Sequence, residues 1–587
     1  MAIGYTNDLR LSEMATGDNA GSWGVVTNAN LTFIGEALGY GTEGITTNAD
    51  THTSTIADGA TDPVRALFIK YTGTLDSACT ITIGPNSVNK FCFIHNATSG
   101  SQSIIISQGS GANVTITTGQ TKAVYLDGAG AGAAVIDAFA TLSVVDLLVE
   151  DDLTVSGEIA ADLTFADGAD IITASAGTSN FRAGVNAGNS IASGGNYNVA
   201  VGDEAGTAIT TGDANTFVGY TAGDATTTAE SNVAIGKGSL STNILGSKSV
   251  AIGAEALATQ NPATAVDMYN VAVGHDAGYA ITTGIQNTFI GGQAGDANTT
   301  ANNNTGVGKS SLSATTTGGE NTAVGTNALK VNTTASNNTA VGTNALTANT
   351  TGAQNTAVGT SAGAAITTAV NTVVMGYQAG DAITTGNNNV AIGTTALSAN
   401  TTGASNTALG HAALLANTTA ADNTAVGFSA LGANTTGYSN TAVGKSALIT
   451  NTTGHRNSAF GKDSLDANTT GYYNVAVGEA SLGANTDGHS NTALGHEALL
   501  NNTEGDENVA VGNGALTTNT TAGSNTAVGT NALRLTTTGA NNTAVGKSAL
   551  DANTTGTENV AVGAFALDVV TTASYSTAVG TSSLSAA

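Results

Sequence analysis

The chain has little of the material from which catalytic centres, disulfide frameworks and nucleic-acid interfaces are built. Its 587 residues include 2 cysteines, 3 prolines and 1 tryptophan, and only 10% of them are charged. The 42 Asp and Glu residues outnumber the 15 Lys and Arg residues, so the net charge is −27. A nucleic-acid binder needs a basic face and an anionic membrane repels an acidic chain, so we expect neither partner. No run approaches the roughly 20 apolar residues of a membrane-spanning helix, which argues against membrane insertion.

Two cysteines, Cys79 and Cys92, are too few for a disulfide framework. We expect them on neighbouring strands, where one disulfide or two free thiols would both fit. We favour two buried free thiols, because free cysteine is among the most buried residue types. The first residues, Met1 to Asp8, have neither the basic nor the apolar region of a secretory signal, so we expect no signal peptide.

The C-terminal two thirds of the chain, residues 198–587, repeat one short sequence. Asn-Thr-Ala-Val-Gly at 321–325 returns 17 residues later at 338–342, and again at 355–359. Its glycine, the anchor glycine, recurs from Gly202 to Gly580 in 23 units, with one four-residue insertion between Gly253 and Gly274. So short a fixed period is typical of a solenoid, in which each repeat forms one coil that only its neighbours bury.

The consensus N-T-A-V-G-x-x-A-L-x-x-N-T-T-G-x-x predicts short strands and turns, because it is rich in Thr and Val and closed by Gly and Asn. The residue before the anchor glycine is bulky and apolar in all 23 units, and the one before that is alanine in 19. We expect each 17-residue coil to hold two short strands and two turns. At a rise of roughly 4.8 Å per coil, the array would be a rod of roughly 110 Å.

Alternation along a strand places Thr322 and Val324 on one face and Ala323 on the other. We expect the large side chains to fill the coil, and the Ala/Ser-lined flank to let another backbone approach. A narrow solenoid is poorly buried alone, so we predict that chains associate as a homotrimer, although the spacing fixes neither the number of chains nor the handedness. The predicted structural ladder of one coil consists of Asn321, Val324, Gly325, Ala328 and Leu329.

Asparagine stands four residues before the anchor glycine in 20 of the 23 units. A polar side chain repeated in register can stack amide on amide, each bonding to the next coil. An asparagine that serves as a turn residue, because it tolerates left-handed backbone, fits the same pattern.

The N-T-A-V-G-x-x-A-L unit resembles the head repeats of trimeric autotransporter adhesins, which read N-S-V-A-I-G with a shorter period. Residues 232–236 (N-V-A-I-G) and 249–253 (S-V-A-I-G) match them best. The resemblance covers about two thirds of the chain and implies a left-handed, parallel, trimeric β-roll that adheres to surfaces. The secretion signal and membrane barrel of that family are not seen in this sequence.

Residues 1–50 differ from the rest and contain the only tryptophan. A lone tryptophan among glycines fits a local core anchor. However, the pattern G-x-x-x-G-x-W-G followed by T-N-x-N-L resembles the N-terminal segment of tail fibres and virion-associated proteins of tailed bacteriophages. The resemblance implies attachment to the virion through Gly17, Gly21, Trp23, Gly24 and Asn28.

Residues 51–140 read as a compact β domain, because β-branched runs alternate with Gly, Pro, Asn and Ser turns. These runs are at 67–69, 79–83, 91–94, 104–106, 114–116 and 122–126. The glycine cluster at 128–132 lacks the spacing and the following helix of a dinucleotide loop, so we expect a hairpin turn there.

Residues 141–197 are expected to form a shaft or transition region. Leu148 to Gly157 resembles the D-L-T-V-x-G segments of phage fibre shafts, in which strands of three chains wrap together. The acidic run 150–152 would fit a metal site only if its side chains converged. Consecutive residues of a strand point to opposite faces, so we favour a solvated turn.

No set of residues in the sequence has the spacing of a catalytic or metal centre. The seven histidines are scattered, and none falls in a metal-ligand cluster or a Ser-His-Asp set. Carboxylates that recur on one face of a β-helix would fit a polysaccharide-cleaving site, but isolated Asp and Glu in turns are mostly solvated. We therefore predict no enzymatic activity, no cofactor and no metal.

The repeats vary most in the two residues after the anchor glycine and in the two before the asparagine. In the C-terminal half these positions carry large or charged side chains, which are those that binding surfaces use. The candidate surface-contact residues are Phe428, Tyr438, His455, Arg456, Tyr472, Tyr473, His489 and Phe565.

These patterns together favour an all-β, elongated, trimeric fibre of a phage virion, with the N-terminus on the virion, or its tail or baseplate proteins, and the solenoid meeting a host glycan or protein. A separate tip protein would fit at the distal end. The alternatives are a bacterial surface or secreted adhesin, a structural spacer and an ice-binding solenoid. An ice-binding face would need two outward threonine files per coil, whereas alternation gives Thr333 and Thr334 opposite faces.

Overall fold

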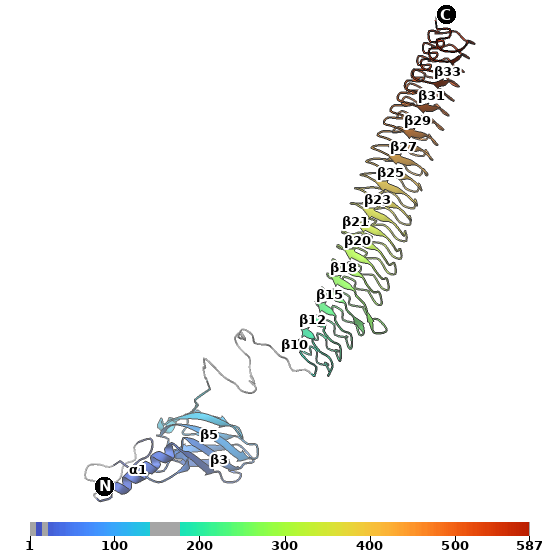
Figure 1. The fold of residues 1–587 in the computed structure, drawn as a ribbon. Coiled ribbons are helices and arrows are strands. Elements are labelled where there is room, and N and C mark those ends of the chain that lie inside the picture. The colour runs from blue at the N-terminus through green and yellow to red at the C-terminus, as the bar shows by residue number, and fades with distance from the viewer. Residues whose placement is uncertain (1–6, 14–20, 141–175, 586–587) are drawn as a thin grey trace. The chain divides into compact units, whose positions relative to one another are not determined.

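The computed structural model describes residues 7–13, 21–140 and 176–585, and the chain divides into two units, Met1–Thr164 and Phe165–Ala587 (Figure 1). The first unit is a small β domain with one α-helix, and the second is a parallel β-solenoid. Gly17, the acidic run 150–152 and the expected shaft segment 148–157 lie outside the described residues.

Two sheets make up the N-terminal unit. The first has the order β1(Tyr40–Gly44), β3(Phe68–Thr74), β5(Asn89–Ser99), β8(Thr121–Asp127) and β9(Val135–Asp137). The second has the order β2(Thr51–Thr55), β4(Cys79–Gly84), β6(Ile104–Ser107) and β7(Val114–Ile116). The chain passes from one sheet to the other between β1 and β6, so the strands of β1–β3–β5 and of β2–β4–β6 pair in parallel. Alternate residues of both sheets point into one core that contains Ile69, Ile81 and Ile94.

The six strands expected between residues 67 and 126 are confirmed, and so is the hairpin turn, because β8 and β9 pair antiparallel on either side of the glycine cluster and the short helix η2(Gly130–Gly132). Cys79 and Cys92 are buried free thiols, as predicted. They are not on neighbouring strands of one sheet, however, because β4 and β5 belong to different sheets.

An α-helix, α1(Trp23–Ala37), precedes the first strand and was not expected from the sequence. Trp23 is 53% exposed, so it is not a local core anchor. The buried residue of the helix is Phe33, whose ring lies 4.5 Å from the Arg65 guanidinium. Arg65 belongs to the short helix η1(Pro63–Arg65), is buried, and pairs with Asp62 at 3.1 Å and Glu36 at 3.6 Å.

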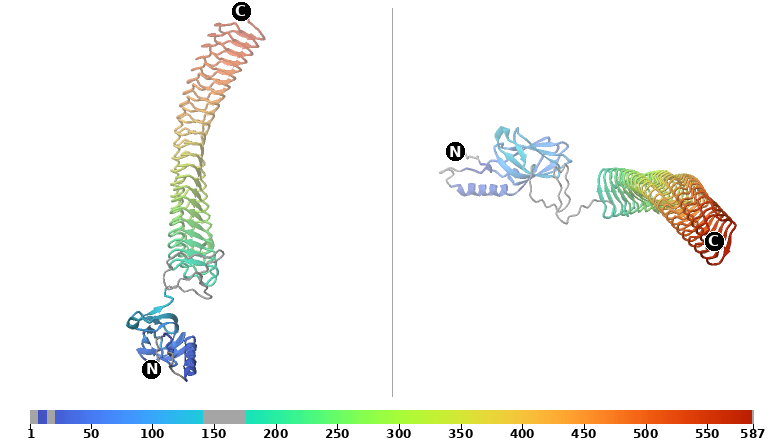
Figure 2. Two further views of the ribbon diagram at one scale, coloured as in Figure 1. Left: turned by 90° about the vertical axis from the view of Figure 1, so that its left-hand side faces the viewer. Right: turned by 90° about the horizontal axis from the view of Figure 1, so that it is seen from above.

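The solenoid is a 24-stranded parallel sheet in which strands of successive coils pair in register. Its strands are β10(Phe181–Ala183), β11(Val199–Val201), β12(Thr216–Val218), β13(Val233–Ile235), β15(Val250–Ile252), β17(Val271–Val273), β18(Thr288–Ile290), β19(Thr305–Val307), β20(Thr322–Val324), β21(Thr339–Val341), β22(Thr356–Val358), β23(Val373–Met375), β24(Val390–Ile392), β25(Thr407–Leu409), β26(Thr424–Val426), β27(Thr441–Val443), β28(Ser458–Phe460), β29(Val475–Val477), β30(Thr492–Leu494), β31(Val509–Val511), β32(Thr526–Val528), β33(Thr543–Val545), β34(Val560–Val562) and β35(Thr577–Val579). Two further views show the coils stacked in single file along one gently curving axis (Figure 2).

A typical described coil has one strand of three residues, so the expectation of two strands per coil is wrong. The remainder of the coil is turns. In the described part of the solenoid the exception is the insertion, where β16(Val266–Asp267) pairs with β14(Gly246–Ser247) of the preceding coil as a small second sheet. The array also begins one coil before the first expected repeat, because β10 pairs in register with β11.

The two faces of the strand are the reverse of those expected. Ala323 is fully buried, whereas Val324 is 38% exposed and Thr322 is half-buried. The interior of the coil is too narrow for a large side chain from the strand, because Ala328 and Leu329 of the opposite wall already fill it. The prediction that successive strand residues point to opposite faces is confirmed, but the assignment of the inner and the outer face is wrong. The face exposed to solvent is the Thr/Val face rather than an alanine flank.

Each coil closes through residues with left-handed backbone. In one coil they are Glu320, Asn327 and Leu329, with φ of 59°, 58° and 50°. The anchor Gly325 has φ 133°, and a Cβ there would lie 2.6 Å from the Gly342 carbonyl oxygen of the next coil. Glycine is therefore required at this position by both its conformation and the close approach of the next coil.

Bulky residues replace the buried alanine only where the opposite leucine is absent. Phe217 takes the alanine position in its coil, and the leucine position there is Gly223, where a Cβ would lie 2.6 Å from the ring. The coil before it also has a glycine, Gly206, whose Cβ would lie 2.9 Å from the same ring. The ring thus fills the volume that leucine fills in other coils, which keeps the core closely packed.

Candidate binding surface

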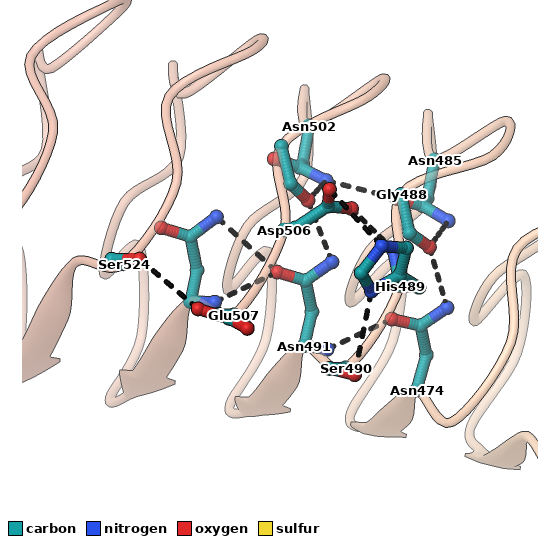
Figure 3. A network of polar contacts seen from close by, with 12 residues as sticks. Asn474, Asn485, Gly488, His489, Ser490, Asn491, Asn502, Asp506, Glu507 and Ser524 are labelled. Atoms are coloured by element: carbon teal, nitrogen blue, oxygen red, sulfur yellow. Dashed lines mark hydrogen bonds and ion pairs between the residues drawn. The ribbon is translucent and has the colours of Figure 1, made fainter.

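Two ladders of buried asparagines hold the turn that carries the most variable residues. In the first, the Asn491 N–H donates to Asn474 Oδ1 of the preceding coil at 2.9 Å, and Asn491 Nδ2 donates to the Gly505 carbonyl at 2.7 Å (Figure 3). In the second, Asn502 Nδ2 donates to Asn485 Oδ1 at 2.8 Å and to the same Gly505 carbonyl at 3.0 Å. Satisfied buried amides of this kind fix the turn that lies between them.

The first ladder confirms the predicted stacking of asparagines. The alternative, that asparagine stands there for its left-handed backbone, is wrong, because the left-handed residue is the one before it, for example Glu320 before Asn321. The second ladder was not predicted. The sequence does contain a signal for this second ladder, namely the second asparagine of the consensus, seven residues after the anchor glycine. From the sequence alone, that asparagine indicates only a polar turn.

Six of the eight candidate surface residues lie together on this turn in consecutive coils. Tyr438, His455, Tyr472 and His489 occupy one repeat position, and their rings stack with centroid separations of 4.8, 5.2 and 4.8 Å and interplanar angles of 11°, 2° and 21°. Arg456 and Tyr473 occupy the next position. We call these six residues the aromatic cluster.

Arg456 lies between two tyrosines. Its guanidinium carbon is 5.6 Å from the Tyr438 ring centroid and 5.4 Å from that of Tyr473, and Nη1 donates to the Tyr473 hydroxyl. Tyr473 is 46% exposed and stands nearly perpendicular to Tyr472 and His455. Cation–π contacts and the hydrogen bond therefore hold the arginine head at the surface of the cluster.

The C-terminal end of the stack is acidic. His489 Nε2 lies 3.2 Å from Asp506 Oδ2, and the His489 N–H donates to Asp506 Oδ1 at 2.8 Å (Figure 3). Glu507 follows directly and accepts a hydrogen bond from Ser524 of the next coil at 3.3 Å. The cluster thus has a cation near one end and carboxylates at the other.

The other two candidate surface residues lie elsewhere. Phe428 is 51% exposed and stacks on His411 at 5.2 Å, both directly after an anchor glycine. Phe565 is 38% exposed, with Lys547 Nζ 5.6 Å from its ring centroid. Their repeat positions follow the strand in each coil, whereas those of the aromatic cluster precede it.

The N-terminal candidates that the structure describes lie at the start of α1. Gly21 has φ 100°, Trp23 and Gly24 begin the helix, and the Asn28 carbonyl accepts a hydrogen bond from Thr32 Oγ1 at 2.9 Å. One side of α1 leaves apolar residues at helical spacing exposed, namely Trp23, Leu31, Ile34 and Leu38. Gly17 lies outside the described residues.

A recess of about 230 Å³ gathers carboxylates near the insertion. It is lined by Glu255, Asp276, Tyr279 and Asp296. Burial, and then the charge of Asp276, raise the pKa of the Asp296 carboxyl, one oxygen of which is buried and without a hydrogen-bond partner. Among the residues that the structure describes, no group of three or more His, Cys, Asp or Glu has a metal-binding arrangement.

The paired threonines of each coil have different surroundings. Thr333 is half-buried and donates from Oγ1 to the Thr350 carbonyl at 3.2 Å, whereas Thr334 is exposed. This turn therefore contributes one outward threonine file per coil, as alternation predicted.

Within residues 7–13, 21–140 and 176–585, no helix has both the length and the hydrophobicity that crossing a bilayer requires. Comparisons with protein-family models, with curated proteins and with solved structures return no match to this chain.

Proposed function

We propose that this protein is a structural and adhesive fibre of a phage virion, a tail fibre whose solenoid meets the host surface. The observation that carries the proposal is the uninterrupted parallel solenoid of 24 strands, which displays one exposed turn from coil to coil. At roughly 4.8 Å per coil the solenoid extends for roughly 115 Å. This length suits a fibre that contacts a distant surface rather than an enzyme that encloses a substrate. The role is structural and adhesive, not catalytic.

The fibre is a homotrimer, and its chains meet through the Thr/Val face of the strands. The two outward positions of the strand, three residues and one residue before the anchor glycine, hold only Thr, Val, Ser and larger apolar residues from 199 to 579. No member of the 42 acidic residues falls on this face, so like chains can approach without charge repulsion. Strands roughly 10 Å long, stacked over roughly 115 Å, give each chain an apolar face of roughly 1,150 Å², which a trimer divides between its two neighbours.

The N-terminal unit attaches the fibre to the virion. The exposed apolar side of α1 supports this role, because a helix face with Trp23, Leu31 and Leu38 in water suits burial in a groove of a partner protein. Adhesion then works by avidity, since three chains and several fibres multiply weak contacts with a host glycan or protein.

The self-association is tested by light scattering on the purified chain. We expect the mass of three chains, and a monomer for the triple variant Val324→Lys, Val341→Lys, Val358→Lys, which places cations on three successive strands. The control is Thr326→Lys, Thr343→Lys, Thr360→Lys, at exposed positions where other coils carry Lys309 and Lys445. A monomeric wild type, or a Val→Lys variant that remains trimeric, would contradict the assignment of this face.

The virion role is tested by immunogold electron microscopy with an antibody against the solenoid. Label on the fibres of phage particles supports the proposal. Label on the bacterial surface in the absence of phage would favour the adhesin alternative.

A further inference from the structure

The rings of the aromatic cluster are not needed to build the coil. Their two repeat positions hold Ala421 and Asp422 in the preceding coil and Asp506 and Glu507 in the following one, with unchanged strand register. Left-handed backbone at the second position is likewise independent of the side chain, because Ser439, Arg456 and Tyr473 share φ between 57° and 59°. The coil therefore folds in the same way without the side chains of the aromatic cluster.

We propose that the aromatic cluster binds a saccharide that carries a carboxylate, an inference that rests on the proposed adhesive function and names its ligand class.

The stack offers a row of polar edges rather than ring faces. The inner rings, His455 and Tyr472, have a ring on both sides, at 4.8 to 5.2 Å, so their faces are covered. Phenol hydroxyls and imidazole nitrogens alternate along the row. Each can donate or accept a hydrogen bond, and a saccharide laid along the fibre axis presents hydroxyls to such a row.

Arg456 supplies the site for the carboxylate. Among the described residues it forms no ion pair, whereas Arg534 of the same solenoid is bound by Asp551 through two contacts of 2.8 and 3.2 Å. Arg10 and Arg65 of the N-terminal unit are likewise each paired with an aspartate. Since the tyrosines hold the guanidinium in place and use one of its five N–H donors, its fork is available for a bidentate carboxylate.

Carboxylates flank the cluster at both ends. Asp422 lies two coils before Arg456 and Glu507 three coils after it, separations of roughly 10 and 14 Å along the axis. Carboxylates accept hydrogen bonds from sugar hydroxyls and repel a ligand carboxylate. The acidic group of the ligand therefore lies at Arg456, and its hydroxyls lie along the row of rings.

Binding is tested on an array of uronate and sialate oligosaccharides, each beside its neutral methyl ester. We expect the wild-type protein to bind acidic members at least tenfold more strongly than their esters. Arg456→Ser, a residue that Ser439 and Ser490 show this position accepts, should lose that preference, and Arg456→Lys should keep part of it. Tyr473→Ser should weaken binding at least fivefold.

Tyr377→Ser is the matched control, because Tyr377 is 54% exposed on a distant coil and should bind as the wild type does. Circular dichroism of each variant checks that the solenoid is intact. Absence of binding to acidic members, equal binding of acids and esters, or an Arg456→Ser variant that binds normally would overturn the inference.

Attachment of fluorescent protein to host cells separates this inference from the proposed function. If cells bind the wild type and Arg456→Ser equally, the saccharide site is wrong while the adhesive role stands. If neither binds, both are wrong.

Discussion

The ring of Phe217 occupies the space that a side chain at Gly223 would need. A Cβ on Gly223 would lie 2.6 Å from two atoms of that ring, although the two residues stand on opposite walls of the same coil. In the consensus coil the same volume is shared the other way, with Ala323 on the strand and Leu329 on the opposite wall. The total side-chain volume in the core is thus the same in both kinds of coil, but the large side chain comes from the strand in one and from the opposite wall in the other.

This exchange predicts strong coupling between the two positions. Phe217→Ala should destabilise its coil by about 3–5 kcal/mol, as expected when a buried aromatic ring is removed. Gly223→Leu alone should also destabilise, because the new side chain overlaps the ring. The double variant, which restores the consensus pair, should recover most of the loss. Amide hydrogen exchange of residues 199–240 measures the effect, and additive losses in the double variant would contradict it.

The asparagine ladder predicts a loss that spreads to the next coil. Asn440→Ala removes the acceptor of the Asn457 N–H, now at 3.0 Å, and the donor to the Gly454 carbonyl, now at 2.8 Å. The Asn457 N–H is left buried and unpaired, at about 1–3 kcal/mol, whereas the Gly454 carbonyl keeps its bond from Asn451 Nδ2 at 2.9 Å. We expect faster hydrogen exchange at Asn457 than in distant coils. Asn501→Ala, at an exposed asparagine, is the control and should leave exchange unchanged.

The half-buried carboxylate of Asp296 predicts a pH dependence of opposite sign to that of an ion-paired aspartate. Burial raises its pKa above the ordinary 3.8, so the folded state binds the proton more tightly than the unfolded state does. The folded state therefore gains stability when Asp296 is protonated, and loses that gain as the pH rises from 3.8 through the raised value.

Asp296→Asn should consequently raise the Tm at neutral pH, with a difference from the wild type that vanishes near pH 3. Calorimetry at both pH values checks this. Asp487→Asn, at an exposed turn, should shift the Tm less. A lower Tm for Asp296→Asn at pH 7 would show that the charged carboxylate is stabilising instead.

The two thiols should be unreactive in the folded protein. Both are fully buried, and burial raises the pKa of Cys92 to about 11, so almost none of it is thiolate at pH 7. A thiol reagent should count no sulfhydryl in native protein and two in denaturant without reductant. A count of zero in denaturant would mean that the cysteines are paired.

The repeat array was predictable because each of its signals recurs. The 17-residue period located the strands of the long parallel sheet from 199 to 579 and the stacked asparagines, since a ladder needs the same residue at the same position in successive coils. The β10 coil was missed because its glycine, Gly184, precedes Gly202 by 18 residues instead.

Which strand residues point inward was not predictable from alternation, because an alternating pattern fits equally well with either set of residues in the core. The choice depends on what fills the opposite wall, and Leu329 reaches inward only because it adopts φ 50°, a conformation rare for leucine. The helix α1 has a serine at its N-cap, Ser22, but no acidic residue in its first turn and no basic residue in its last, so its charge pattern does not mark a helix. The aromatic cluster was named residue by residue, but the ring stack and the position of Arg456 follow from turn geometry that the sequence leaves open.

Because every coil bonds only to the one before and the one after it, coils with the consensus Ala/Leu core can follow one another in any order. Loss or duplication of a 17-residue block, such as one between Gly325 and Gly342, would rejoin equivalent backbone with the same register. The length of the solenoid is therefore a quantity that unequal recombination between nearly identical stretches of the coding sequence can adjust in steps of one coil, without a new folding problem at each step.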